Sequence, residues 1–436
     1  MSKKVNIFWF RRDLRLQDNV GFYKALHGKF PVLPIFIFDK NILEKLPEKD
    51  ARVTFIFETL QSLRSQLQEH GSSIALYHGT PRGVFEEICH DFEVQNVITN
   101  HDYEPYAKER DAAVKDFLSE KNIGFYTFKD QVIFEKEEVV KDDGNPYVVY
   151  TPYSKKWLEK LGKSNSLKTY DPSEKFSQLY QHSRLPNLSL SDLGFEKSSI
   201  KVLPFNISEK TINHYQQTRN FPANTEGTTH LSPHLRFGTI GIRTLVNKAL
   251  ESNNPTFLKE LIWREFFMQI LWHFPHTVTK SFKAPYDRIV WRNNETEFEA
   301  WKKGETGYPF VDAGMRELNE TGFMHNRVRM IVASFLCKHL LIDWRWGEAY
   351  FAEKLLDYEM SSNVGNWQWA AGSGVDAAPY FRIFNPTTQI DKFDKNHGYI
   401  KHWVPEYTAE KYPKPIVDHK EARERCLETY KSALNG

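Results

Sequence analysis

The sequence predicts an α/β domain with a doubly wound parallel sheet, followed by an all-α domain. Over residues 1–130, short apolar runs alternate with helical patterns, which is typical of parallel strands joined by helices. From residue 205 to residue 436, apolar residues recur mainly at helical spacing. Residues 131–204 are polar and rich in turn-forming residues, which indicates an interdomain connector.

Strands and their connecting helices account for the α/β part, where the clearest helix covers residues 51–69. The expected strands are Val5–Phe10, Val32–Phe38, Ser73–Tyr77, Asn96–Thr99 and Gly124–Phe128. No GxGxxG motif follows the first strand, so a dinucleotide bound through that fingerprint is not expected in this sheet. The sequence RRDLRLQDN stands there instead. Its arginines are expected to form structural ion pairs rather than an anion site, and they are Arg11, Arg12 and Arg15.

Capping and breaking residues divide the rest of the chain into helices. The expected helices lie near 150–161, 209–219, 257–272 and 309–322, with another from residue 324 and a charged one within 400–436. Ser232 is expected to cap a further helix, with Pro233 in its first turn. Such a helix start is a natural seat for a pyrophosphate, although a capped helix without a ligand is commoner.

The helix expected at 257–272 is apolar on most faces but carries charged residues. Glu260, Trp263, Arg264 and Phe267 follow one stripe of it. A carboxylate and a guanidinium in such a helix are costly unless they are paired or line a cavity. The sequence leaves both roles open, including a pair formed by Glu260 and Arg264.

Residues 357–389 combine acids, an asparagine, tryptophans and several glycines. Asn363 and Trp367 are four residues apart and share one helix face. The glycines and Pro379 then end the helix in a loop that can approach a ligand closely. Taken alone, the same residues describe equally well a buried helix that ends in a packed loop.

Composition limits the partners and the compartment. The net charge is +2, so a nucleic-acid partner would need a local basic patch. No apolar run reaches about 18 residues, and MSKKVNIFWF lacks the features of a secretory signal. Cys89, Cys337 and Cys426 lie far apart without a CxxC pair, which favours a reducing, cytoplasmic location and argues against a metal site.

Five motifs occur in a fixed order along the chain. They are WFRRDLRLQDN (9–19), ELIWREFF (260–267), TGYPFVDAGMREL (306–318), MHNRVRM (324–330) and WQWAAGSGVDAAPYFRIFNPTTQ (367–389). Together they resemble the photolyase/cryptochrome family, and most nearly its bacterial class I branch, which acts on cyclobutane pyrimidine dimers. The resemblance implies light-dependent DNA repair. In it, reduced FAD excited by blue light gives an electron to a flipped-out dimer and splits it.

The resemblance also implies which residues hold FAD. The matching positions are Tyr215, Thr228, Thr229, His230, Leu231, Ser232, Arg264, Arg329, Asp357, Tyr358, Glu359 and Asn363. Within this set, Arg329 is expected to pair with Asp357, and Asn363 to face flavin N5. Plant cryptochromes carry an acid at the position of Asn363, so the amide favours repair over signalling.

Other matching residues imply a lesion site, a DNA-contacting rim and an electron relay. The lesion-site residues are Glu260, Trp263, Asn326, Met330, Asn363 and Trp369. Glu260, Trp263 and Asn326 would also contact DNA, together with Phe267, Arg327, Arg382, Gln389 and Lys392. The relay that photoreduces flavin would be Trp367, Trp344 and Trp291, with Trp301 or Trp346 as bystanders or alternatives.

The antenna and the rival functions depend on departures from the family pattern. Tyr106 and Ala107 replace the Asn-Glu pair of folate-binding members, so a deazaflavin or flavin antenna, or none, is favoured over methenyltetrahydrofolate. A cryptochrome photoreceptor and a (6-4) photolyase are the alternatives. The (6-4) class carries a pair of histidines at its lesion site, and in this sequence Asn326 follows His325 instead. We expect a monomer without an obligate protein partner that acts on DNA containing pyrimidine dimers.

Overall fold

A computed structural model describes residues 4–435, and contacts between Cα atoms divide the chain into two compact units. The sheet unit comprises residues 1–138, 158–203 and 231–251. The helical unit comprises residues 139–157, 204–230 and 252–436. Each unit therefore combines segments that are distant in sequence, and the contiguous domains expected with boundaries at 130 and 204 stay a prediction.

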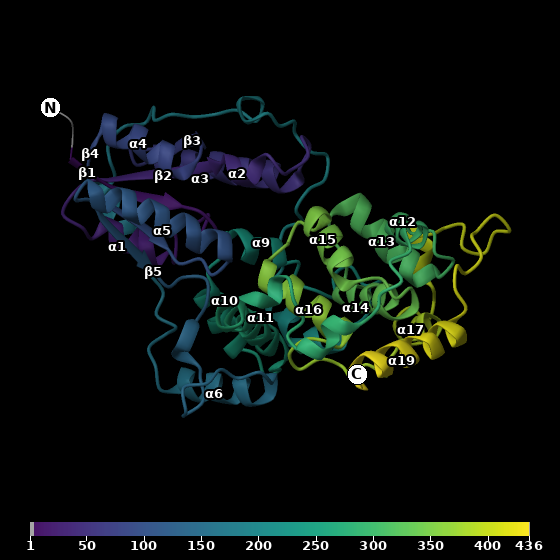
Figure 1. The fold of residues 1–436 in the computed structure, drawn as a ribbon. Helices are drawn as coiled ribbons and strands as arrows, with labels where there is room; N and C mark the ends of the chain where they lie inside the picture. Colours follow the sequence, from purple (N-terminus) through teal and green to yellow (C-terminus); the bar gives the residue numbers. More distant parts are fainter. Residues whose placement is uncertain (1–3, 436) are drawn as a thin grey trace. The chain divides into compact units, whose positions relative to one another are not determined.

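The sheet unit contains five parallel strands in the order β3-β2-β1-β4-β5, which confirms the predicted doubly wound sheet (Figure 1). The strands are β1 (Lys4–Phe10), β2 (Val32–Asp39), β3 (Ala75–Gly79), β4 (Glu93–Asn100) and β5 (Gly124–Phe128). The helices that connect them or follow are α1 (Val20–Leu26), α2 (Lys40–Leu43), α3 (Ala51–Gln68), α4 (Pro81–Asp91), α5 (Pro105–Glu120), α9 (Ser232–Phe237) and α10 (Ile242–Leu250).

Alternate residues of β1 point to opposite faces of the sheet, and both faces are covered. Ile7 and Trp9 pack in a cluster with Phe85 of α4 and Phe117 of α5. Phe8 packs on the other face, in a cluster that also contains residues of α1 and α3. Burial on both faces explains why the strands read as continuous apolar runs rather than as an alternation.

The arginines after β1 are held in ion pairs, as predicted. Arg15 donates to Asp130 at 2.7 Å, and Arg243 of α10 donates to Asp130 and to Asp18, each at 2.7 Å. The other arginines pair as Arg11 with Asp111, and Arg12 with Asp102 and Glu104. Neighbouring guanidinium groups lower the pKa of the Asp130 carboxyl against the effect of its burial.

The helical unit is built from α11 (Thr256–His273) and the helices that follow it (Figure 1). These are α12 (Glu295–Lys303), α13 (Pro309–Thr321), α14 (Asn326–Ser334), the π-helical turn η6 (Phe335–His339), α15 (Trp344–Lys354), α16 (Met360–Ala371), α17 (Pro386–Phe393), α18 (Gly398–Trp403) and α19 (His419–Asn435). Helix α6 (Tyr150–Gly162) crosses the division between the units. Among residues 4–435, no helix is both long and apolar enough to cross a membrane.

Two helix predictions are wrong in detail. The helix expected at 209–219 is two short ones, α7 (Glu209–Asn213) and α8 (Tyr215–Thr218), separated at His214. Ser232 is the first residue of α9 rather than its cap, because Leu231 occupies the capping position and supplies no side-chain hydrogen bond. Pro233 does lie in the first turn.

Two glycines set the distance between α16 and its neighbours. A Cβ at Gly365 of α16 would lie 2.3 Å from the Phe267 ring of α11. A Cβ at Gly347 of α15 would lie 2.1 Å from the Trp367 ring of α16. Only glycine permits either approach, so both rings pack directly on a neighbouring backbone.

We expect Gly365→Ala to lower the free energy of unfolding by about 1–3 kcal/mol, because overpacking against Phe267 exceeds the gain in helix propensity. Chemical denaturation measures the effect. Gly162→Ala in α6 is the matched control, because a Cβ there meets no atom within 4 Å. Equal unfolding free energies for the two variants would contradict the close packing at Gly365.

Candidate functional site

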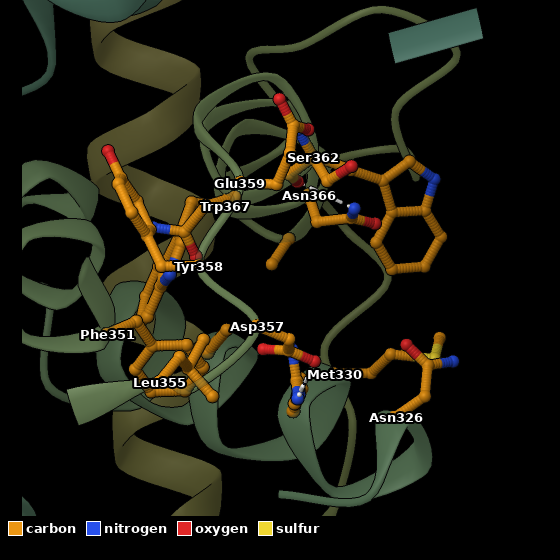
Figure 2. A pocket seen from close by; sticks show the side chains of 15 residues that line it. Asn326, Met330, Phe351, Leu355, Asp357, Tyr358, Glu359, Ser362, Asn366 and Trp367 are labelled. Atoms are coloured by element: carbon orange, nitrogen blue, oxygen red, sulfur yellow. Dashed lines mark hydrogen bonds and ion pairs between the residues drawn. The ribbon is translucent and has the colours of Figure 1, made fainter. Parts of the chain in front are cut away.

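A cavity of about 100 Å³ opens among α14, α15 and α16 and the segment between the last two. It brings together many of the residues predicted to bind cofactor or lesion, namely Asn326, Arg329, Met330, Asp357, Tyr358, Glu359, Asn363, Trp367 and Trp369. In Figure 2, Asp357, Met330 and Asn326 lie across the cavity from Glu359, Ser362 and Asn366.

The ion pair predicted between Arg329 and Asp357 is confirmed at 2.8 Å. Arg329 also donates through Nε to the Met324 carbonyl at 2.7 Å, so its side chain is fixed at two points. The other carboxylate oxygen, Asp357 Oδ1, is buried and has no hydrogen-bond partner among the described residues. This oxygen is therefore an acceptor available to a donor group of a ligand in the cavity.

Glu359 begins the helix that carries most of the cavity wall. Its carboxylate accepts hydrogen bonds from the Ser362 backbone N–H at 2.9 Å and from the Ser361 hydroxyl at 2.5 Å. This cap lies four residues before Asn363 and fixes the first turn of α16. Glu359 thus lines the cavity chiefly as a structural residue.

Asn363 is oriented by Glu348, a residue that the sequence did not indicate. Asn363 Nδ2 donates to the Glu348 carboxylate at 2.9 Å and to its backbone carbonyl at 3.1 Å. Both amide hydrogens are therefore used, and no described residue donates to the Asn363 Oδ1 atom. Burial raises the pKa of Glu348, and hydrogen bonds from Asn363 and Tyr358 oppose the shift. The sequence feature that could have indicated Glu348 is its position as an acid inside the aromatic run WRWGEAYF (344–351).

Trp263 and Phe267 lie on α11, outside the residues that line the cavity. The Trp263 ring stacks on Tyr150 with centroids 3.8 Å apart and an interplanar angle of 4°, and it also contacts Phe267 at 5.6 Å. The Tyr150 hydroxyl donates to the Lys259 carbonyl, one turn before Trp263. Tyr150 was not predicted, because its partner is more than a hundred residues away.

Glu260 is half-buried, and its charge is paired across the helical unit. It forms an ion pair with Arg219, whose guanidinium lies 5.3 Å from the centroid of the Tyr215 ring. The structure brings Glu260 and Tyr215 together through Arg219, and Arg264 lies on the same helix as Glu260.

The segment 228–232 is divided between the units. Thr228, Thr229 and His230 belong to the helical unit, whereas Leu231 and Ser232 belong to the sheet unit. His230 adopts a positive φ of 51°, and the Thr229 carbonyl accepts a hydrogen bond from the Asn206 N–H. None of these residues lines the cavity, so their phosphate-binding role stays a prediction.

Beyond the residues on α11, the side chains predicted to contact DNA lie on α14, α17 and the loop between α16 and α17. Arg327 donates to the Asn220 side chain at 2.6 Å and lies 4.2 Å from the Phe393 ring centroid. Arg382 and Lys392 are exposed, and Gln389 is partly exposed. These three side chains supply the kind of local polar and basic surface that the low net charge requires.

The predicted relay tryptophans belong to one aromatic region without direct ring contacts. Trp367 and Trp344 are buried in the same apolar cluster, and Trp291 packs against it. Between residues 4 and 435, the ring partners of Trp367 are Phe351 at 4.9 Å and Trp301 at 6.2 Å. Trp301 is thus the tryptophan in ring contact with Trp367, and the relay order stays a prediction.

In the sheet unit, Tyr106 is anchored at the end of β2. Its hydroxyl donates to Asp39 at 2.5 Å and accepts from the Asn41 side chain at 3.1 Å. Ala107 is buried beside it in α5. The position that carries an Asn-Glu pair in folate-binding members is therefore occupied by a tyrosine bonded within the protein and a buried methyl group.

Comparison with known proteins places the chain among light-dependent repair enzymes. Two family descriptions match it: DNA photolyase over residues 6–173, and FAD binding domain of DNA photolyase over residues 257–411. A deoxyribodipyrimidine photo-lyase of Halobacterium salinarum is 36% identical, covering 98% of this chain and 99% of the relative.

Solved structures agree with these matches. A bacterial class III photolyase from Agrobacterium tumefaciens has a TM-score of 0.88 at 33% identity, covering 100% of this chain and 99% of its own. An archaeal photolyase from Sulfolobus tokodaii with two FAD molecules has a TM-score of 0.84 at 33% identity, covering 98% of this chain and 100% of its own. On its sequence motifs, its sheet and helical units and these matches, the chain belongs to the DNA photolyase family.

Proposed function

We propose that the protein is a deoxyribodipyrimidine photo-lyase that repairs cyclobutane pyrimidine dimers in DNA under blue light. The observation that carries the proposal is the orientation of Asn363 in the cavity wall. Glu348 accepts both hydrogen bonds from the Asn363 Nδ2 atom, and the Asn363 Oδ1 atom is left to accept one from a ligand. A neutral amide accepts a hydrogen bond without supplying a proton. The direct test is restoration of bases in a thymine-dimer oligonucleotide by purified protein under blue light.

The cavity residues suit FAD. Asp357 Oδ1 and Asn363 Oδ1 are acceptors for N–H groups of a flavin, and Arg329 offers a cation beside Asp357. When bound and reduced, FAD would supply the light-driven one-electron redox chemistry that dimer splitting requires. The chain's own residues bind the cofactor, fix its donors and acceptors, and exclude water from it.

The lesion is received by aromatic walls and polar groups that face a common site in this proposal. Trp263 and Trp369 pack against the extruded dimer, while Glu260, Asn326 and Met330 contact its edges. Tyr150 stacks on one face of the Trp263 ring and so fixes the orientation of this wall. Arg327, Arg382, Gln389, Lys392 and Phe267 position the strand without reading its sequence.

A (6-4) photolyase is disfavoured by the residues on α14. The histidine beside Asn326 is His325, whose Nδ1 accepts a hydrogen bond from the Arg327 N–H as the cap of this helix. Burial, together with the nearby Arg327 and Arg329, lowers the pKa of His325 to about 4. A neutral capping histidine cannot act as the acid of a paired-histidine site at neutral pH.

A cryptochrome photoreceptor without repair is the alternative from another functional class. The amide of Asn363, in place of an acid, argues against it. Class I membership also stays a prediction, because the structural relatives include a class III photolyase. Dimer turnover decides between enzyme and photoreceptor.

A second flavin-type chromophore in the sheet unit is the antenna that we favour, because Tyr106 and Ala107 replace the folate pair. The relative from Sulfolobus tokodaii with two FAD molecules supports this proposal. The free cysteines Cys89, Cys337 and Cys426 support a reducing compartment, and we propose a cytoplasmic monomer.

Asn363→Asp tests the amide. The two side chains have nearly the same shape, so we expect FAD content to persist and the unfolding free energy to change by less than about 1 kcal/mol. Burial favours the protonated carboxyl, which can give a proton where the amide cannot. Dimer repair should therefore fall, and the visible spectrum of the illuminated protein should change.

Glu348→Gln is the matched variant, because it keeps an acceptor oxygen for Asn363 Nδ2. We expect it to retain more repair than Asn363→Asp. Full repair by Asn363→Asp with an unchanged spectrum would remove the amide from the mechanism.

Substitution of the relay tryptophans separates cofactor reduction from repair. Trp291→Phe should slow light-driven reduction of oxidised cofactor by about tenfold or more, while chemically reduced protein repairs normally. Absorbance during illumination with an external thiol reductant measures the rate. Trp301→Phe is the comparison: a larger loss there than at Trp291 would assign the route to the ring in contact with Trp367.

A further inference from the structure

Lys338 is a fully buried lysine to which the proposed repair site gives no role. It lies in the π-helical turn η6 with 0% of its surface exposed. Buried lysines are rare unless they are paired, because removing an ammonium from water is costly. Turns of this kind occur frequently at functional positions. Burial also lowers the pKa of Lys338.

The ammonium of Lys338 forms a hydrogen bond with the loop that follows α16. Its Nζ donates to the Tyr380 carbonyl at 2.8 Å and lies 5.1 Å from the centroid of the Tyr430 ring in α19. The Tyr430 ring in turn stacks on Tyr380, with centroids 5.8 Å apart and an interplanar angle of 15°. The Tyr430 hydroxyl donates to the Ala371 carbonyl at the end of α16.

Tyr380 directly precedes Phe381 and Arg382, the exposed residues at the tip of this loop. Before it, Ser373 and Val375 are buried, and the Ser373 carbonyl accepts a hydrogen bond from the Lys283 N–H at 2.9 Å. After it, Phe381 is 61% exposed and Arg382 is exposed. The exposed tip is therefore anchored on its N-terminal side at the Tyr380 carbonyl.

We propose that Lys338 is a positioning residue for DNA binding, which holds Tyr380 and thereby presents Arg382 to the phosphate backbone. The inference rests on the proposed function, in which Arg382 contacts DNA. Lys338 acts through a backbone carbonyl, so the sequence of the loop can vary while the anchor is kept. The charge is tolerated because a carbonyl dipole and an aromatic face stabilise it together.

A double-mutant cycle tests whether Lys338 acts through Arg382. Lys338→Met keeps the length of the side chain and removes its donors, and Arg382→Gln removes the phosphate contact. We expect each to weaken binding of a thymine-dimer oligonucleotide about tenfold, as for one charge-assisted hydrogen bond. The double variant should bind no more weakly than Arg382→Gln, and both single variants should show a shallower salt dependence.

Two further measurements separate positioning from general destabilisation. Lys338→Met should speed trypsin cleavage after Arg382 in the absence of DNA, while FAD content stays unchanged. Lys431→Met, which removes an exposed lysine from α19, should alter neither cleavage nor binding. If Lys338→Met does not fold, Lys338→Gln replaces it, because Gln keeps one N–H donor group in a shorter side chain.

The outcomes distinguish the inference from its premise. If Arg382→Gln leaves binding unchanged, the proposed DNA contact is wrong. If Arg382→Gln weakens binding but the Lys338 variant does not, the positioning role is wrong. Additive losses in the double variant would show that Lys338 acts independently of Arg382 and would overturn the inference.

Discussion

The close approach of α16 to α11 and α15 is the constraint on which the site depends. Gly365 admits the Phe267 ring of α11 to the backbone of α16, and Gly347 admits the Trp367 ring of α16 to the backbone of α15. Asn363 precedes Gly365 by two residues and Trp367 by four on α16, and its partner Glu348 follows Gly347 directly on α15. Close-packed interiors have little room for adjustment. The absence of side chains at Gly365 and Gly347 therefore fixes the position of α16, which carries Asn363 and much of the cavity wall.

The sequence was most informative where one local rule governed the outcome. The strand at 124–128 was predicted with its observed bounds, because short apolar runs between turn residues define strands well. The pair of Arg329 and Asp357 came from the family resemblance and formed as expected. Ser232 was misplaced by one position, since caps depend on backbone angles that residue identity alone does not fix.

Residues that act through distant partners could not be predicted. Arg264 offers Glu260 an opposite charge one helical turn away, yet the ion pair that the structure shows for Glu260 is with Arg219 at the end of α8. Tyr150 and Glu348 gain their importance from a stacked ring and an oriented amide, and both contacts join segments separated in sequence. Periodicity specifies the face on which a residue lies, but the partner on that face is decided by packing.

The sheet unit carries a consequence for how the chain is made. Asp18 and Asp130 are buried beside Arg243, which is synthesised more than a hundred residues after Asp130. Until α10 has left the ribosome, these carboxylates keep only part of their compensating charge, and an incompletely paired buried charge is strongly unfavourable. The amino-terminal sheet should therefore reach its final packing late in translation, and a fragment that stops after β5 is a poor candidate for independent folding.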